Sequence, residues 1–330
     1  MRKPKILITH WVHEEIIEYL SEYGEVVTNQ TRQSMKKGRL WAEIENAVAI
    51  MAFMPDSIDK EFLSHCNKLK IVGAALKGYD NFDVDACTTK GVWFSIVPNH
   101  LTTPTAELAV GHLIAIGRNM QAGDRLIRNG HFPGWRPVLY GRGLAGSTIG
   151  ILGMGEVGRA IAKLLMSFSC SCLYYDTCKL EKSREQELNA YSSSLEDIYR
   201  KSDFIVVALP LNPDTIHVID IQALDKCKKG VYIVNVGRGS SVDEKAVAQG
   251  LEKGQLAGYA ADVFEFEDWA RTGRPQAIPA ELTDRLDTTF LTPHLGSAVE
   301  SVRKNIAMEA AVNIVEALQG KRPHGAINSI

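Results

Sequence analysis

The sequence predicts an α/β protein built from two parallel-sheet domains with a cleft between them. Three observations lead to this prediction. Short apolar runs alternate with amphipathic segments of helical period along the chain, a pattern typical of parallel sheets covered by helices. The chain has 330 residues, more than one ordinary hydrophobic core holds together. A glycine-rich motif at residues 153–158 stands in mid-chain between an apolar run and a helical one.

The first hundred residues predict one α/β domain. The runs of apolar and β-branched residues that predict its strands lie at 5–9, 25–28, 47–51, 69–75 and 92–96. A helix is expected over residues 13–23, with Ile16, Ile17 and Leu20 on one face. Because helical segments separate the strands, we expect the strands to pair in parallel.

The glycine motif reads Gly-Met-Gly-Glu-Val-Gly, which is G-x-G-x-x-G. It follows the apolar run 147–152 and opens a helical run, the arrangement of a Rossmann dinucleotide-binding domain. The glycines permit a tight turn and bring the backbone close to a pyrophosphate at the positive end of the helix. Asp176 ends the next strand, about 20 residues on, where an acid binds ribose hydroxyls. We expect NAD as cofactor, preferred over NADP, with contacts at Gly153, Gly155, Glu156, Val157, Gly158 and Asp176.

The remaining elements indicate how the two domains are connected. Further strands are predicted at 204–209, 231–235, 256–261 and 290–292. A long helix over 103–119 opens with a cap candidate and an early proline, just ahead of the glycine motif. The last helix, 298–318, is expected to cross back to the first domain. The predicted division is a discontinuous substrate-binding (catalytic) domain, 1–99 plus 299–330, and an inserted NAD-binding domain, 100–298.

Charge and composition argue against several functions. Lys and Arg number 37 against 39 Asp and Glu, so there is no electrostatic reason to bind nucleic acid or an anionic membrane. The basic start of the chain has too short an apolar run for a signal peptide. The most apolar helix is interrupted by His112 and is short for a membrane span. Cysteines and histidines show no metal-binding spacing, and we expect a cytoplasmic protein without a metal.

Three segments together resemble the D-2-hydroxyacid dehydrogenase family, in the order in which that family has them. They are the glycine motif, the loop Asn-Val-Gly-Arg-Gly around Arg238, and the segment 258–265 followed by Thr-Pro-His-Leu-Gly-Ser around His294. The resemblance covers essentially the whole chain. It implies an NAD-dependent dehydrogenase, a homodimer with the helix 103–119 as a candidate interface element, and a catalytic set of Arg238, Glu267, His294 and Lys77.

The side-chain chemistry of the catalytic candidates also supports their expected roles. A permanently charged, planar guanidinium between two glycines, such as Arg238, suits a bidentate oxyanion. A histidine whose ring is oriented by a carboxylate serves as an acid or base, although a lone histidine such as His294 is more often structural. Glu265, Glu267 and Asp268 all stand near enough in sequence to be that partner, and the resemblance selects Glu267.

The resemblance also implies the residues around the nicotinamide and the substrate. The expected nicotinamide neighbours are Thr105, Leu209, Pro210, Gly237 and Asp262. Within the family, several local strings are similar to the phosphonate (phosphite) dehydrogenases, among them Met-Ala-Phe-Met-Pro-Asp at 51–56 and Gly-Trp-Arg-Pro-Val-Leu-Tyr at 134–140. This similarity implies substrate contacts from Met54, Lys77, Gly78, Trp135, Tyr140, Ser297 and Arg303, although spacing alone favours core or surface positions for most of them.

The expected function is therefore oxidation of phosphite to phosphate, with His294 activating the attacking water and NAD receiving the hydride. Lys77 and Arg238 would supply the two cations that a phosphite approaching a charge of −2 requires. The alternative in the same class is a D-2-hydroxyacid dehydrogenase or glyoxylate-hydroxypyruvate reductase. An NAD(H)-sensing binding protein or corepressor is the alternative of a different class, and the intact Arg, Glu and His set argues against it.

Overall fold

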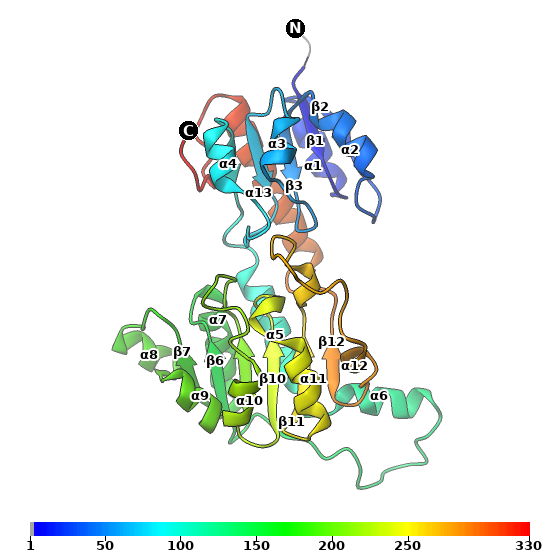
Figure 1. Cartoon of the computed structure of the whole chain (residues 1–330), viewed down its shortest axis with the longest axis vertical. Coiled ribbons are helices and arrows are strands. Elements are labelled where there is room, and N and C mark those ends of the chain that lie inside the picture. Colours follow the sequence, from blue (N-terminus) through cyan, green and yellow to red (C-terminus); the bar gives the residue numbers. More distant parts are fainter. Residues whose placement is uncertain (1–2) are drawn as a thin grey trace. The chain divides into compact units, whose positions relative to one another are not determined.

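The computed structural model describes residues 3–330, and these divide into two compact units (Figure 1). Unit 1 contains the chain up to Leu101 together with Ala298–Ile330, and unit 2 is Thr102–Ser297. The boundaries expected from the sequence, at 99–100 and 298–299, lie beside these two cuts. Each unit has its own parallel sheet, so the prediction of two parallel-sheet α/β domains is confirmed.

Unit 1 is a five-stranded parallel sheet in the order β2-β1-β3-β4-β5. Its strands are β1 (Lys5–Ile8), β2 (Glu25–Thr28), β3 (Ala47–Ala52), β4 (Ile71–Ala74) and β5 (Trp93–Ser95). Its helices are α1 (Glu14–Ser21), α2 (Lys37–Ile44), α3 (Lys60–Ser64), α4 (Val84–Thr89) and α13 (Glu300–Leu318). Successive strand residues face opposite sides, so Ile6 and Ile8 pack in one apolar cluster and Leu7 in another.

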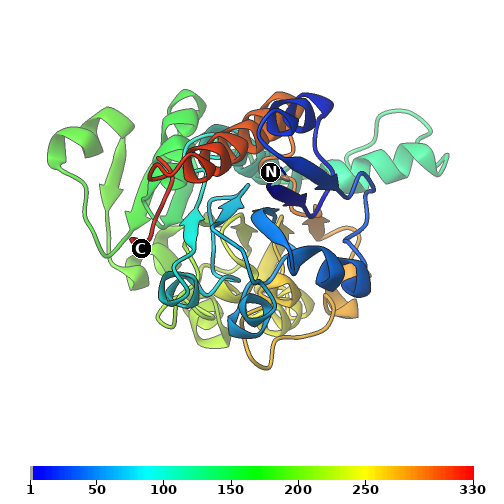
Figure 2. The ribbon, with the colours of Figure 1, turned by 90° about the horizontal axis from the view of Figure 1, so that it is seen from above.

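The helix α13 belongs to unit 1, although it is separated in sequence from the rest of that unit by the whole of unit 2. It packs on β3 and β4 and lies beside α1 (Figure 2). A side chain at Gly73 in β4 would bring its Cβ within 2.7 Å of Ile314, so helix and strand are in close contact. The last helix therefore completes the core of the first domain.

Unit 2 is a seven-stranded parallel sheet in the order β12-β11-β10-β9-β6-β7-β8, with helices on both faces. The strands are β6 (Thr148–Leu152), β7 (Ser171–Tyr175), β8 (Ala190–Ser192), β9 (Phe204–Val207), β10 (Val231–Asn235), β11 (Leu256–Ala261) and β12 (Thr289–Leu291). The helices are α5 (Thr102–Gly117), α6 (Met120–Arg128), α7 (Glu156–Leu165), α8 (Lys182–Leu188), α9 (Leu195–Lys201), α10 (Ile221–Lys226), α11 (Glu244–Glu252) and α12 (Ala280–Thr283). Three short 3₁₀ turns are η1 (Met166–Phe168), η2 (Gly239–Ser241) and η3 (Glu265–Glu267).

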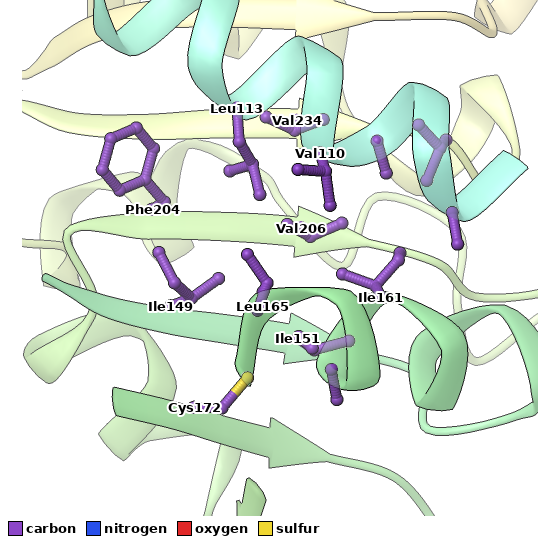
Figure 3. Packing of buried hydrophobic residues seen from close by; sticks show 14 of the residues in the cluster. Val110, Leu113, Ile149, Ile151, Ile161, Leu165, Cys172, Phe204, Val206 and Val234 are labelled. Carbon is purple, nitrogen blue, oxygen red and sulfur yellow. The ribbon is translucent and has the colours of Figure 1, made fainter. Parts of the chain in front are cut away.

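One face of this sheet is covered by α5 and α7 (Figure 3). Leu113 of α5 and Ile161 of α7 are almost fully buried with Ile151 and Val206 of the strands beneath them. Each fully buried aliphatic side chain of this kind contributes roughly 1.5–3 kcal/mol. The strand order reverses direction between β6 and β9, which is where ligands bind in open α/β sheets, at the carboxyl ends of the strands.

The structure corrects the expectation for the helix over 103–119. The helix α5 ends at Gly117, Asn119 takes a left-handed φ of 52°, and α6 begins at Met120. The helix α5 packs on α7, β10 and β11 of its own unit, and most of its apolar residues belong to the core of that unit. Among residues 3–330, none of the helices is both long and apolar enough to cross a membrane.

Candidate active site

Most predicted site residues of unit 2 lie in the loops that follow the carboxyl ends of the strands. In strand order, the positions are Gly153 after β6, Asp176 after β7, Leu209 and Pro210 after β9, Gly237 and Arg238 after β10, Asp262 and Glu267 after β11, and His294 after β12. Because the strands are parallel, their carboxyl ends meet at one edge of the sheet. The sheet therefore gathers residues that are far apart in the sequence along a single edge.

The loop after β6 needs glycine at two positions. Gly153 has a φ of +95°, and a Cβ there would lie 2.7 Å from the Ala208 carbonyl oxygen. A Cβ at Gly158 would lie 2.0 Å from the Gly153 oxygen. A Cβ at Gly155 would meet nothing within 4 Å, so there is open space at the amino end of α7. A tight turn with free space over a helix N-terminus fits a bound pyrophosphate.

Asp176 is attached directly to this glycine loop. Its Oδ2 accepts a hydrogen bond from the backbone N–H of Met154 at 2.6 Å, and its Oδ1 accepts from the N–H of Cys178 at 2.9 Å. These bonds hold the carboxylate at the end of β7 beside the loop, which is where an acid contacts ribose hydroxyls in this fold.

The other predicted cofactor residues border the same loops. Glu156 at the start of α7 accepts a hydrogen bond from the Thr102 hydroxyl at 3.3 Å. Gly237 lies against the loop after β9, because a Cβ there would be 2.6 Å from the Leu209 oxygen. Thr105 in α5 lies beside the loop after β12, with its Oγ1 3.1 Å from the position of a Cβ on Gly296. The neighbouring residues Val157 and Pro210 are partly buried and exposed, respectively.

His294 and Glu267 form a direct pair. The Nδ1 of His294 lies 2.8 Å from the Oε2 of Glu267, and both side chains are only partly exposed. The other oxygen of Glu267 accepts from the Phe264 N–H at 2.9 Å, which orients the carboxylate within its own turn. Of the three acids left open by the sequence, Glu265 contacts His217 instead and Asp268 accepts from the Ser240 N–H.

The backbone at His294 is left-handed, with a φ of 54°, and Asp262 holds it there. The His294 N–H donates to the Asp262 carbonyl at 2.9 Å. The Asp262 carboxylate accepts from the N–H groups of Leu295 at 2.6 Å and Gly296 at 2.8 Å, and from the Thr292 hydroxyl at 2.6 Å. Asp262 is buried, with 2% of its surface exposed, and its hydrogen bonds hold the His294 loop in place. The sequence did not predict this role.

A residue that sequence reasoning passed over, His112, continues this chain of contacts. Its ring nitrogens lie 2.8 Å from the Leu108 oxygen and 2.9 Å from the Thr292 hydroxyl. Burial lowers the pKa of His112, so the ring has a reduced tendency to carry charge. The sequence feature that could have drawn attention to His112 is its position within an otherwise apolar helical segment.

Arg238 is presented by a loop fixed at both ends. The Asn235 side chain donates to the Arg238 carbonyl at 3.0 Å and accepts from the Gly237 N–H at 3.1 Å. The Arg238 guanidinium is partly buried and donates to the Gly237 carbonyl at 2.9 Å. Next to it, Gly239 lies so close to the Phe264 backbone that a Cβ would be 1.9 Å from a carbonyl carbon. The Arg238 loop and the Glu267 turn are thus packed backbone against backbone.

The predicted substrate residues lie in several places. Met54 follows β3, and Lys77 and Gly78 follow β4 at the carboxyl edge of the unit 1 sheet, all partly buried. Arg303 is on α13, and Ser297 is 6% exposed at the end of unit 2. A cavity of about 410 Å³ in unit 1, with Thr9 and Asp56 in its wall, is lined by none of these residues.

Trp135 and Tyr140 lie on the segment after α6 and are 77% and 80% exposed. The structure therefore leaves both rings largely uncovered by other residues of the chain. No group of three or more potential metal ligands of the His, Cys, Asp or Glu type occurs in the part of the chain that the structure describes, residues 3–330.

Comparison with known proteins places this arrangement in a family. Residues 110–296, more than half of the chain, match the NAD-binding domain of D-isomer specific 2-hydroxyacid dehydrogenases. The chain belongs to the D-isomer specific 2-hydroxyacid dehydrogenase family. It is therefore an oxidoreductase whose second unit contains the family's NAD-binding domain, and NAD is its cofactor.

Relatives match over nearly the full length of this family member. Glyoxylate reductase of Pyrococcus horikoshii is 35% identical over 99% of this chain and 96% of its own. Glyoxylate reductase of Aeropyrum pernix is 34% identical, over 99% and 97%. Among solved structures, a Thermus thermophilus protein has a TM-score of 0.88 at 28% identity, over 98% of this chain and 100% of its own. A glyoxylate reductase of Paecilomyes thermophila has a TM-score of 0.84 at 26% identity, covering 99% of both chains.

Proposed function

We propose that this dehydrogenase acts on a small oxyanion by hydride transfer, with His294 as the acid or base and Arg238 holding the anion. The observation that carries this proposal is the His294–Glu267 contact of 2.8 Å at the carboxyl edge of the NAD-binding sheet. A carboxylate on Nδ1 fixes the ring so that Nε2 faces away from Glu267 and can exchange a proton with a substrate. NAD supplies the hydride acceptor, or NADH the donor. Thr105, Asp262 and Ser297 border the loop that presents His294.

The substrate class that the comparisons support best is a 2-oxo acid such as glyoxylate. The relatives that align over almost the whole chain at 31–35% identity are mostly named glyoxylate reductase. In that reaction Arg238 would bind the carboxylate. His294 would donate a proton to the carbonyl oxygen while hydride adds to the carbon, giving a 2-hydroxy acid.

Phosphite is the second candidate, and Lys77 is the residue that favours it. A carboxylate substrate needs one cation, whereas phosphite approaches a charge of −2 and suits two, Lys77 and Arg238. Hydride would leave phosphorus as the oxygen of water forms a new P–O bond, and His294 would take the proton of that water. Met54, Gly78 and Arg303 would complete the substrate contacts. The local strings around residues 51–56 and 134–140 are the sequence features that support this reading.

We also propose that NAD is preferred over NADP. The carboxylate of Asp176, held at the end of β7 by the Met154 N–H, would accept from the ribose hydroxyls. The same negative charge would repel a 2′-phosphate. The ratio of kcat/KM with the two cofactors measures this preference directly, and a ratio near one would count against the assignment of Asp176.

One assay separates the candidate substrates. Purified protein is given glyoxylate, hydroxypyruvate or pyruvate with NADH, and separately phosphite with NAD, while absorbance at 340 nm is recorded. The proposal expects strong turnover in one of the two arms. Reduction of glyoxylate without phosphite oxidation establishes the 2-oxo acid. NADH formed one for one with phosphate establishes phosphite. Turnover in neither arm contradicts the proposed substrates and favours a binding protein.

Lys77→Ala provides the matched comparison for the same assay. If phosphite is the substrate, loss of one of two cations beside the anion should lower turnover severely, by about 10²-fold or more. If a 2-oxo acid is the substrate, Arg238 alone binds the carboxylate and the variant should retain most of its activity. If phosphite is the substrate and Lys77→Ala oxidises it as fast as the wild type does, Lys77 is not a substrate-binding residue.

A further inference from the structure

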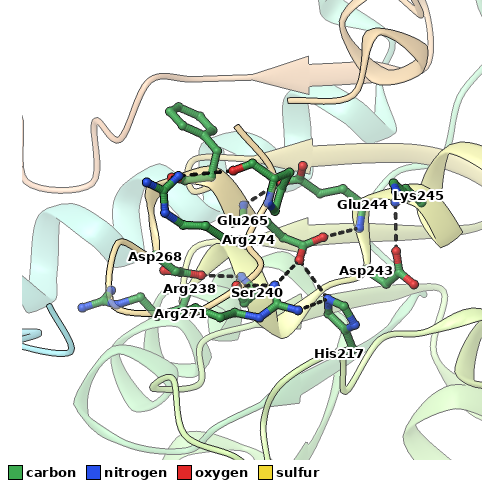
Figure 4. Close-up of polar contacts among 12 residues, drawn as sticks. His217, Arg238, Ser240, Asp243, Glu244, Lys245, Glu265, Asp268, Arg271 and Arg274 are labelled. Carbon is green, nitrogen blue, oxygen red and sulfur yellow. Dashed lines mark hydrogen bonds and ion pairs between the residues drawn. The ribbon is translucent and has the colours of Figure 1, made fainter. Parts of the chain in front are cut away.

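A second group of polar side chains lies beside the Arg238 loop of unit 2 (Figure 4). It consists of His217, Ser240, Glu244, Glu265 and Arg271, and we call it the Glu265 cluster. Its central carboxylate is 7% exposed, and Ser240 and Glu244 are almost fully buried. Buried polar groups on this scale are costly unless they are hydrogen-bonded, so the cluster needs an explanation.

One oxygen of Glu265 is held from two sides. Its Oε2 lies 2.8 Å from the Nε2 of His217 and 2.5 Å from the Nη1 of Arg271. The same Nη1 lies 3.1 Å from the Ser240 hydroxyl, on the turn η2 that follows Arg238. The guanidinium thus joins the Glu265 side chain to the Arg238 loop.

The other contacts of Glu265 are reciprocal with Glu244. The Glu265 N–H donates to the Oε1 of Glu244 at 2.9 Å, and the Glu244 N–H donates to the Oε1 of Glu265 at 3.3 Å. Burial raises the pKa of Glu244 to about 8, and the nearby negative charges of Glu265, Glu267 and Asp268 add to this. At neutral pH a protonated Glu244 can therefore lie against the Glu265 side chain without like-charge repulsion.

These contacts determine where the catalytic carboxylate lies. Glu265 and Glu267 are the two ends of the short turn η3. A 3₁₀ turn of three residues has few hydrogen bonds within its own backbone, so contacts with neighbouring residues hold its conformation. The Phe264 N–H binds Glu267 at one end of the turn, and the Ser240 N–H donates to Asp268 at 2.7 Å just beyond it. A displaced Glu265 would move the turn and with it the oxygen that contacts His294.

We propose that Glu265 is a positioning residue, which aligns Glu267 with His294 through its contacts to His217, Arg271 and Glu244. The proposal rests on the catalytic role proposed above for His294. It assigns no contact with substrate to Glu265. A residue of this kind acts only through Glu267, and this gives it a signature that a merely stabilising residue lacks.

The test is a double-mutant cycle with Glu265→Gln and Glu267→Gln in the full chain, using the substrate that the wild-type protein turns over. Glu265→Gln should lower kcat by roughly tenfold with little change in the Kd of NAD. Added to Glu267→Gln, the same change should have almost no further effect, because the contact it aligns is already lost. Effects that multiply would overturn the proposal.

A second measurement needs no turnover, so it remains informative if the proposed substrates are wrong. In protein labelled with ¹⁵N-histidine, the Nδ1 resonance of His294 reports its contact with Glu267, and the signal is assigned by its loss in His294→Asn. Glu265→Gln should shift this resonance in the direction that Glu267→Gln shifts it. An unchanged resonance would contradict the proposal whatever the substrate.

Asp203→Asn is the matched control. Asp203 is also a largely buried carboxylate of unit 2, bound by Arg142 and by the Thr148 N–H, but it lies at the amino ends of β6 and β9. This variant should be less stable than the wild type and still keep its kcat and its His294 resonance. If Asp203→Asn changes both to the same extent as Glu265→Gln, general destabilisation explains the data and the proposal fails.

Discussion

At the residue scale, the proposed chemistry depends on which carboxylate contacts His294. Glu267 reaches Nδ1 at 2.8 Å because its own turn directs it there, while Glu265 in the same turn contacts His217 and Arg271. Two carboxylates separated by one residue therefore have different partners. The pair holds the Nδ1 of His294, and the proton transfer proposed above uses the other ring nitrogen, Nε2.

The first prediction concerns this ring. His294→Asn keeps a polar side chain of similar size but removes the group that exchanges a proton, so kcat should fall by at least about 10²-fold. NAD binding, measured by fluorescence titration, should be nearly unchanged because the glycine loop and Asp176 are untouched. Near-normal turnover in the variant would show that another residue is the acid or base.

Glu244 gives a prediction of pH dependence. Its pKa in the folded protein is raised by burial to about 8 from an ordinary 4.5, so between these values the unfolded chain loses a proton that the folded chain keeps. The wild-type free energy of unfolding should therefore fall with rising pH across this window, by at most about 1.4 kcal/mol per pH unit from this group. Below 4.5 and above 8 the contribution is constant.

Glu244→Gln removes that titration and keeps the acceptor for the Glu265 N–H. The melting temperature of the variant, relative to wild type, should therefore rise from pH 5 to pH 8, as measured by calorimetry. Glu252→Gln, at the exposed end of the same helix α11, corrects for the loss of one negative charge. A difference between Glu244→Gln and wild type that stays constant with pH would mean that Glu244 is ionised in the folded protein.

At the scale of elements, the site depends on loops that touch through their backbones. The loop after β10 and the turn after β11 meet at Gly239, where a Cβ would lie 1.9 Å from the Phe264 carbonyl carbon and 2.1 Å from its oxygen. Side chains can rotate away from such a contact, but backbone atoms cannot. A displacement of one loop therefore displaces the other.

Gly239→Ala tests this coupling. The variant should be destabilised by several kcal/mol, about the cost of a strongly overpacked core, and should lose most of its turnover. Gly111→Ala is the control, because this glycine lies on the exposed side of α5 with nothing within 4 Å of a Cβ. In denaturant unfolding it should be stabilised by up to about 1 kcal/mol, the helix preference of Ala over Gly. Equal effects at the two positions would contradict the packing argument.

At the scale of the whole molecule, one segment of unit 2 is unlike the rest of its surface. The helix α6 and the residues after it extend away from the sheet (Figure 1). Large apolar side chains that are more than 40% exposed gather there, namely Met120, Ile127, Phe132, Trp135, Val138, Leu139 and Tyr140. An apolar surface of this extent is typical of a protein interface. We propose that a second copy of the chain covers it, and that the homodimer expected from the sequence forms through this segment.

The wild-type protein should therefore sediment as a dimer at micromolar concentration. Trp135→Ser combined with Tyr140→Ser should shift it toward monomer, because the two rings are 77% and 80% exposed in the single chain. Trp11→Ser, which removes a 48% exposed ring from unit 1, should leave the dimer intact. A wild-type monomer, or a double variant that still dimerises fully, would rule out this interface.

The sequence by itself was sufficient to predict those parts of the fold that depend on local backbone geometry. The glycine loop was predictable because Gly153 and Gly158 have no room for a Cβ, and the strands because their apolar runs are buried on both faces. Which loop each candidate residue occupies followed from the same pattern. The short edge strand β8 was missed because its three residues make too short an apolar signal.

Only the tertiary structure decided which side chains meet. Glu265, Glu267 and Asp268 are nearly equivalent in sequence, and the direction of each depends on a 3₁₀ turn that distant residues hold. The contact of Asp262 with the His294 loop and the exposed position of Trp135 after α6 likewise depend on how distant parts of the chain pack. A strand pattern specifies which edge of the sheet a residue occupies. The partner of a side chain at that edge is set by packing between loops that are far apart in the chain.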